Sequence, residues 1–223
     1  MKCFPAMLVF VVFVVFVVSI GILLPSKAAV IGLFNTGLDD AGVVRADHHL
    51  ETHWNLLPAG ATVPMQPVVL TSTGGFPVGP WLADSTVSTW LSYSEDSNGP
   101  PIDYGFSTAF SLQGLDVDTV SITGRWSSDN AGLDIQINGV STGQTNDAQF
   151  GGWTDFSISS AEGHQFSQGE NTLTFIVNNA PPNNNPIGFR AEFTAAEAAA
   201  IPEPSAVSLF FLGMCSVVFR RRR

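Results

Sequence analysis

The stretch YGFSTAFSL, residues 104–112, alternates large apolar side chains with small or polar ones. A period of two places each set of side chains on one face of a β-strand. The same alternation recurs farther along the chain, at residues 120–126, 133–137, 173–177 and 187–193. Because the outward positions are mostly polar, the pattern predicts sheets with one buried and one solvated face.

Turn residues separate these predicted strands. Asn138-Gly139 suits a two-residue type I′ hairpin, because both residues tolerate a positive φ. Further turn sequences lie at residues 129–132, 169–171 and 181–186, and no amphipathic helix of useful length is predicted. Short strands with closely spaced turns predict an all-β fold, a β-sandwich, over residues 29–194. An alanine-rich linker is expected at residues 195–200.

The first residues are typical of a secretory signal peptide. Lys2 precedes an apolar run at residues 6–24, and Ser26-Lys27-Ala28 places small residues at the two positions that signal peptidase reads. We expect cleavage after Ala28, with Ala29 as the second choice, so residues 1–28 form the signal segment. The alternative is an uncleaved membrane anchor, because about 20 apolar residues can span a bilayer. The body of the chain is exported in both cases.

The last residues, 201–223, combine three features. Pro202-Glu203-Pro204 cannot continue a helix, and the apolar stretch at residues 205–219 predicts a short transmembrane helix. The chain then ends in four arginines, Arg220, Arg221, Arg222 and Arg223. A cluster of arginines beside a membrane segment stays in the cytoplasm, so the body is drawn to the other side.

This arrangement resembles the PEP-CTERM sorting signal, which joins a Pro-Glu-Pro motif, a short membrane helix and a terminal arginine cluster. The resemblance implies export through the inner membrane of a Gram-negative bacterium, with signal peptidase and an exosortase as processing enzymes. It implies transient membrane insertion through the tail and a final location at the cell surface or in the extracellular matrix. The alternative is an ordinary tail anchor that contains the motif by chance.

Between its two apolar ends the chain is strongly acidic and has no thiol. Three arginines stand against 18 carboxylates there, which gives a net charge of −15. Nucleic acid is excluded as a partner, because phosphate binding needs clustered lysines and arginines. Cys3 and Cys215 lie in the apolar ends, so the body is predicted to lack cysteine catalysis, thiolate zinc sites and disulfides.

A second resemblance concerns the body. LDIQING at residues 133–139 and GENTLTFIV at residues 169–177 resemble the galactose-binding-like jelly-roll modules, among them the sugar-binding domain of β-galactosidases. The resemblance covers about residues 104–193 and implies a jelly-roll sandwich. These residues are mainly structural in such folds, so carbohydrate binding follows only as an alternative function.

Tryptophans are the candidate glycan contacts, because an exposed indole stacks on the apolar face of a pyranose ring. Trp126 alternates with apolar residues of a predicted strand and is expected in the core. Trp81, in the loop PVGPW, and Trp153, after two glycines, are expected to be exposed, and Trp54 is a third candidate. The alternative is that these indoles anchor loops.

Two groups of residues are candidate metal ligands. Asn35, Asp39, Asp40 and Asp47 could supply hard oxygen ligands for a structural calcium ion; the alternative is a solvated acidic loop. His49 and His53 have the i, i+4 spacing of two ligands on a helix, but no helix is predicted there. No metal site and no cofactor is therefore assigned, apart from the candidate calcium ion.

Enzymatic activity is not expected. The sequence has no nucleophile elbow and no phosphate-binding glycine loop. The first hypothesis is an exosortase-sorted, non-catalytic protein of the cell surface or extracellular matrix. The alternative is a carbohydrate-binding module for extracellular polysaccharide, and the third hypothesis is an enzyme that acts on polysaccharide through two carboxylates.

Overall fold

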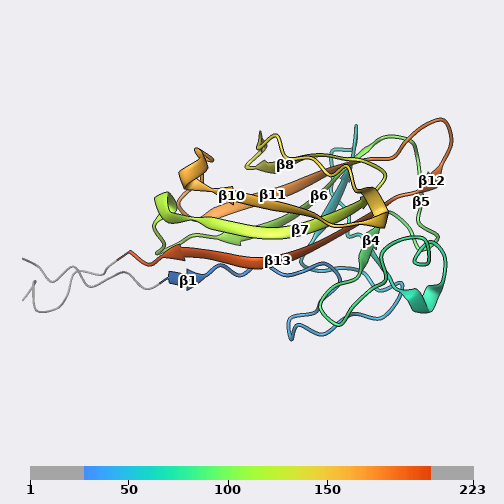
Figure 1. Cartoon of the computed structure of the whole chain (residues 1–223), viewed down its shortest axis with the longest axis horizontal. Coiled ribbons are helices and arrows are strands. Elements are labelled where there is room, and N and C mark those ends of the chain that lie inside the picture. Colours follow the sequence, from blue (N-terminus) through green and yellow to red (C-terminus); the bar gives the residue numbers. More distant parts are fainter. Residues whose placement is uncertain (1–27, 202–223) are drawn as a thin grey trace, which may run out of the picture. The chain divides into compact units, whose positions relative to one another are not determined.

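Residues 28–201, the part of the chain that the computed structural model describes, fold into two facing antiparallel β-sheets (Figure 1). The predicted signal segment up to residue 27, the Pro-Glu-Pro motif, the tail helix and the terminal arginines lie outside the described residues. Within residues 28–201, no helix is long and apolar enough to cross a membrane.

The first sheet has the strand order β10-β7-β13-β4-β3, and β1 pairs with β13 at the side. The strands are β1 (Ala28–Val30), β3 (Val68–Leu70), β4 (Trp90–Ser92), β7 (Ser121–Asp129), β10 (Thr154–Ser159) and β13 (Gly188–Ala199). Strand β13 pairs with β7 over the full length of β7.

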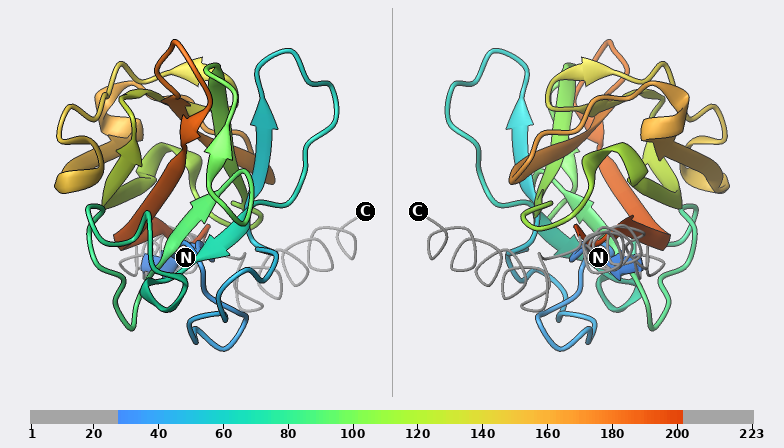
Figure 2. Two further views of the ribbon diagram at one scale, coloured as in Figure 1. Left: turned by 90° about the vertical axis from the view of Figure 1, so that its right-hand side faces the viewer. Right: turned by 90° about the vertical axis from the view of Figure 1, so that its left-hand side faces the viewer.

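The second sheet has the order β2-β6-β11-β8-β9. Its strands are β2 (Asn55–Pro58), β6 (Asp103–Ser111), β8 (Gly132–Ile137), β9 (Val140–Ser141) and β11 (Glu170–Asn178), and a separate short ribbon joins β5 (Asn98–Gly99) to β12 (Asn185–Pro186). The segment after β2 projects from the side of the sandwich (Figure 2). The predicted all-β sandwich is confirmed.

An aromatic core joins the two sheets. Phe106 of β6 and Phe175 of β11 each lie with their ring centroids 4.9 Å from that of Phe189 of β13, and Trp126 of β7 lies 5.2 Å from Phe175. All four side chains are fully buried, as the period-two alternation predicts. Stacked and tilted ring contacts of this kind add to the free energy gained by burying the rings.

The Asn138-Gly139 hairpin forms between β8 and β9 with positive φ at both residues, 52° and 80°. The Asn138 amide also ties the turn to the neighbouring strand: its Oδ1 accepts from Thr172 N, and its Nδ2 donates to Asn171 Oδ1, each at 2.9 Å. The turn that the sequence predicts is therefore held by side-chain hydrogen bonds as well as by its backbone conformation.

The prediction of an alanine-rich linker at residues 195–200 is wrong. Residues 195–199 belong to β13, where Ala195 pairs with Thr123 and Ala196 with Ile122 of β7, after a register shift next to Phe193. Ala198 is buried. The strand continues because β7 and β1 both supply backbone partners for it, which a run of alanines does not reveal. The sandwich consequently extends to the start of the tail.

Candidate functional site

A row of charged side chains crosses the outer face of the first sheet. Asp155 of β10 pairs with Arg125 of β7, and Arg125 pairs with Glu192 of β13. Directly paired residues of antiparallel strands point to the same side of the sheet. Together with the adjacent Trp153, Thr123 and Arg190, these residues define what we call the outer-face site.

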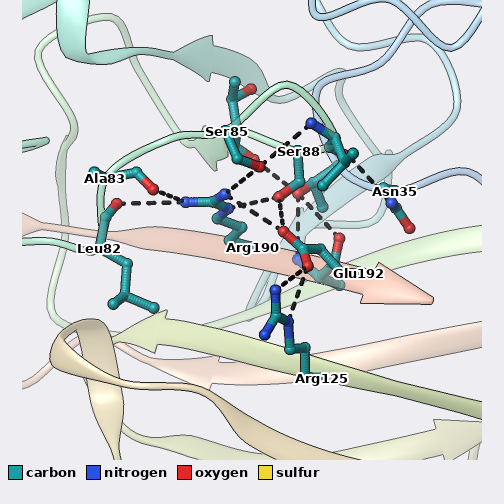
Figure 3. A network of polar contacts seen from close by, with 12 residues as sticks. Asn35, Leu82, Ala83, Ser85, Ser88, Arg125, Arg190 and Glu192 are labelled. Carbon is teal, nitrogen blue, oxygen red and sulfur yellow. Dashed lines mark hydrogen bonds and ion pairs between the residues drawn. The ribbon is translucent and has the colours of Figure 1, made fainter. Parts of the chain in front are cut away.

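Glu192 is the centre of this site. Arg125 donates to Glu192 Oε2 through Nε at 2.9 Å and through Nη2 at 2.6 Å, and Ser88 Oγ donates to Glu192 Oε1 at 2.6 Å (Figure 3). Both carboxylate oxygens are thus engaged by donors. A charge-assisted pair of this kind holds the guanidinium of Arg125 in place while 42% of its side chain stays exposed.

Arg190 closes one end of the site. Its side chain is only 2% exposed, and it donates to Ser88 Oγ at 2.7 Å, to the carbonyl oxygen of Ala83 at 2.6 Å and to Ser85 Oγ at 3.1 Å (Figure 3). Burial lowers the pKa of the Arg190 guanidinium, and the carboxylate of Glu192 opposes that effect. Arg190 therefore fastens the loop before β4 to the sheet and has no donor group left for a ligand.

Trp153 borders the open end of the site. The guanidinium carbon of Arg125 lies 4.6 Å from the ring centroid of Trp153, and that of Arg190 lies 5.0 Å from it. Contacts of a cation with an aromatic ring at this distance are attractive. The indole is partly exposed, so the two arginines fix its orientation without covering it fully.

Beyond Arg125 the outer face is open and polar. Ser157 of β10 pairs with Thr123 of β7, and the hydroxyl of Thr123 lies 3.0 Å from that of Thr194. Ser157, Thr194 and Asp155 are exposed. This part of the sheet offers hydroxyl and carboxylate groups beside the Arg125 guanidinium and the Trp153 ring, which is a mixture of donors and acceptors.

The other two candidate tryptophans lie in the core, and the expected exposure of Trp81 is wrong. Trp81 packs against Trp90, with 4.6 Å between ring centroids, and its Nε1 donates to Asp129 Oδ2 at 2.7 Å. Trp54 packs against Phe189 at 5.1 Å. Both indoles are buried, because the loops that carry them fold back onto apolar clusters. Neither has a free face for a sugar ring.

The four candidate calcium ligands are used in separate hydrogen bonds. Asn35 Oδ1 accepts from Phe193 N. Asp39 Oδ1 accepts from two backbone amides of its own turn, and Asp47 Oδ1 accepts from Thr71 N. Asp40 contacts a histidine, as described next. Within residues 28–201, no group of three or more histidine, cysteine or acidic residues is arranged to hold a metal ion. Calcium binding stays a prediction that these contacts do not favour.

The segment that contains Asp40 also fixes the side chain of His53. Its ring stacks on Phe34 with 3.7 Å between centroids, and its two nitrogens lie 3.0 Å from Leu38 O and 2.8 Å from Asp40 Oδ1. His49 is exposed, and the segment that carries both histidines contains no helix. Their i, i+4 spacing would bring two ligands together on a helix, and it does not do so in this segment.

Sequence reasoning did not single out Arg125, Arg190 and Glu192. A signal was present, since Arg190 and Glu192 occupy outward positions of a predicted strand and only three arginines occur in an acidic body. What the sequence could not provide was the pairing of β7 with β13, which places Arg125 opposite Glu192. That pairing joins residues 67 positions apart.

No family model and no curated protein matches the chain. Among solved structures, the family 35 carbohydrate-binding module from Paenibacillus barcinonensis shares 15% identity and a TM-score of 0.30, over 63% of this chain and 98% of that one. The corresponding module from Clostridium thermocellum shares 12% identity and a TM-score of 0.32, over 77% and 100%. A family 35 module from an environmental isolate shares 13% identity and a TM-score of 0.31, over 66% and 98%. At this level of similarity no residue role transfers, and the outer-face site is interpreted from its own geometry.

Proposed function

We propose that this chain is an exported, non-catalytic β-sandwich protein that binds extracellular polysaccharide through the outer-face site. The observation that carries the proposal is the partly exposed Trp153 ring, which Arg125 holds beside an open row of polar side chains. Sugars present an apolar C–H face and a rim of hydroxyl groups. A fixed indole can stack on the C–H face, and neighbouring donors and acceptors can bind the hydroxyl groups.

The contacts available predict weak binding. One indole and a few polar groups, Arg125, Asp155 and Thr123 among them, are open to a ligand. A single stacking contact with a few hydrogen bonds corresponds to a Kd on the order of 0.1–1 mM, about −4 to −5.5 kcal/mol. Several copies on one surface would bind a polymer more tightly through multivalency.

A glycan array and calorimetry with purified polysaccharides test the site. Trp153→Ala is expected to abolish binding, because it removes the only candidate indole that is not buried. Phe76→Ala is the matched control, since this ring is exposed on the loop between β3 and β4 and takes no part in the outer-face site. Circular dichroism confirms that both variants are folded. Glycan binding that survives Trp153→Ala would exclude this site.

The non-catalytic part of the proposal is supported by the state of Glu192. A glycoside hydrolase uses two carboxyl groups about 5–10 Å apart, one of which must give up a proton. Both oxygens of Glu192 accept hydrogen bonds from Arg125 and Ser88, so this carboxyl group is engaged within the protein. Release of reducing sugar from a bound polysaccharide would contradict this part.

The export route is the second part of the proposal, and residues 201–223 support it by their resemblance to the PEP-CTERM signal. Deletion of these residues is expected to move the protein to a different cell fraction. Identical fractionation of truncated and full-length protein would exclude exosortase sorting. If sorting depends on the tail and no glycan binds, a structural or adhesive role in the matrix becomes the better assignment.

A further inference from the structure

The chain enters and leaves the sandwich at neighbouring points. Strand β1 pairs antiparallel with the end of β13, so that Ala28 lies opposite Ala199 and Val30 opposite Glu197 (Figure 1). The amide of Ile31 continues the ladder by donating to Ala196 O at 2.8 Å. Since paired Cα atoms are about 5 Å apart, the two ends of the described chain leave the sheet side by side.

The exit of the chain is fixed up to the last described residue. Ile201 N donates to Gly114 O at 2.9 Å, and Asp116 N donates to Ala199 O at 2.8 Å. Ala199 N in turn donates to Thr119 Oγ1 at 2.8 Å. The turn after β6 thus clamps the end of β13, which leaves no spacer between the sheet and Pro202. We call this end of the sandwich, formed by residues 28–30, 113–119 and 197–201, the exit pole.

Exposed apolar side chains mark the exit pole. Val30 is 88% exposed and Ile201 is 49% exposed, and each lies within a few residues of an apolar stretch of the sequence, at 6–24 and 205–219. Asp118 and Glu197 are exposed nearby, and the body as a whole carries a net charge of −15. Attraction to anionic lipid therefore cannot hold this pole to a membrane, whereas apolar side chains and covalent anchors can.

We propose that the exit pole faces a lipid bilayer and that both ends of the precursor reach the bilayer there. Ala28 is four positions from Leu24 in the sequence, and Ile201 is four positions from Ser205, which corresponds to about 14 Å when the chain is fully extended. The pole is consequently held within about 15 Å of the hydrocarbon. Signal cleavage after Ala28 leaves the tail attached at the same pole, so the orientation of the sandwich survives that step.

This orientation rests on the proposed export and adds a constraint on the partner of the outer-face site. Glu192 precedes Ala199 by seven residues of the same strand, which corresponds to about 23 Å. The site is thus separated from the exit pole along the sheet. While the tail anchors the protein, the expected ligand of the site is therefore a polymer outside the membrane rather than a lipid headgroup at the exit pole.

The test uses full-length protein in vesicles of phosphatidylethanolamine and phosphatidylglycerol, with Cys3→Ser and Cys215→Ser as background because the body has no thiol. A fluorophore is attached at Val30→Cys or at Ile201→Cys. The control is Asn183→Cys, on the exposed loop between β11 and β12. A quencher carried by the lipid headgroup is expected to remove most of the fluorescence at the two exit-pole positions and to leave the control unchanged.

Equal quenching at all three positions, or quenching only at Asn183→Cys, would overturn the orientation. Thermal unfolding of each labelled protein shows whether the sandwich is intact. The two exit-pole positions are labelled in separate variants, so if one variant is unfolded the other still tests the orientation. Glycan binding by the same vesicles is measured separately. Loss of glycan binding with unchanged quenching would contradict the outer-face site alone.

Discussion

Asp129 is a buried carboxylate whose two hydrogen-bond donors are neutral. Trp81 Nε1 donates to one oxygen and Asn130 Nδ2 to the other, each at 2.7 Å. Burial raises the pKa of Asp129 from 3.8 to about 6, and the hydrogen bond from Trp81 opposes that rise. Since the folded-state pKa lies above the unfolded-state value, the folded protein is favoured when Asp129 is protonated. Its contribution to stability is full below pH 4 and is lost as the pH rises to 6.

We therefore expect Asp129→Asn to flatten the pH dependence of the free energy of unfolding between pH 4 and 6. A shift of about two pKa units corresponds to about 3 kcal/mol, and the gain at pH 7 should be smaller, because one amide oxygen replaces two acceptors. Urea unfolding across this pH range measures the effect. Asp147→Asn, at an exposed carboxylate, is the control and should retain the slope. An unchanged slope in Asp129→Asn would show that another group titrates.

The two arginines of the outer-face site should differ in their importance for stability. Replacement of Arg190 by Met is expected to cost about 3–5 kcal/mol, because it leaves the Ala83 carbonyl and two serine hydroxyls without their buried donor. Arg125→Gln should cost less, about 1–2 kcal/mol, because that side chain is 42% exposed although it donates to the nearly buried Glu192. Denaturant unfolding of both variants makes the comparison. Similar losses of stability in the two variants would contradict the assignment of Arg190 to a structural role and of Arg125 to ligand binding.

At the scale of elements, the contact between β13 and the loop that carries Trp81 depends on Gly188. A Cβ atom at this position would lie 2.4 Å from Trp81 Cη2, which is closer than carbon atoms approach without displacement. Gly188→Ala is expected to cost about 1–3 kcal/mol through overpacking. The change in tryptophan fluorescence and the midpoint of urea unfolding report it. Gly79→Ala, with no heavy atom within 4 Å of its Cβ, is the control; equal stability of the two variants would refute the close packing.

The strands that the sequence predicted are those with enough residues to show a period. β6, β7, β11 and β13 each present four or more alternating positions, so their inward sides were identified correctly. β3, β4, β5 and β12 have only two or three residues each, and they exist because partners distant in sequence supply their backbone hydrogen bonds. The alanines at the end of β13 were misassigned for the same reason, since their partners decide their conformation.

The same limit applies to the candidate site. Exposure of a loop tryptophan depends on where the loop folds, and Trp81 and Trp153 both follow short runs rich in glycine or proline. Trp81 lies in an apolar cluster with Val78 and Trp90, whereas Trp153 contacts two arginines of the first sheet. Local sequence does not distinguish these outcomes, because they are determined by strand pairing and by loop closure over long separations.

At the scale of the whole molecule, the imbalance of charge dominates the electrostatics. Residues 28–201 contain three arginines and 18 carboxylates. Both arginines of the outer-face site share the one carboxylate of Glu192, so most acidic residues have no arginine to pair with. Mutual repulsion among these carboxylates opposes the compact state. Repulsion between exposed charges extends over about 10 Å at 0.1 M salt and about 3 Å at 1 M.

Added salt should therefore stabilise this domain, although it weakens isolated surface ion pairs. The thermal midpoint of residues 28–201 is expected to rise between 0.02 and about 0.5 M sodium chloride, because screening relieves more repulsions than it removes attractions. Scanning calorimetry at pH 7 measures the change, and sucrose at equal osmolality controls for effects that do not depend on charge. Replacing exposed carboxylates, as in Glu95→Gln with Glu170→Gln, should raise the midpoint at low salt and reduce its salt dependence. A midpoint that falls with salt would mean that the few arginine pairs outweigh the repulsion among the carboxylates.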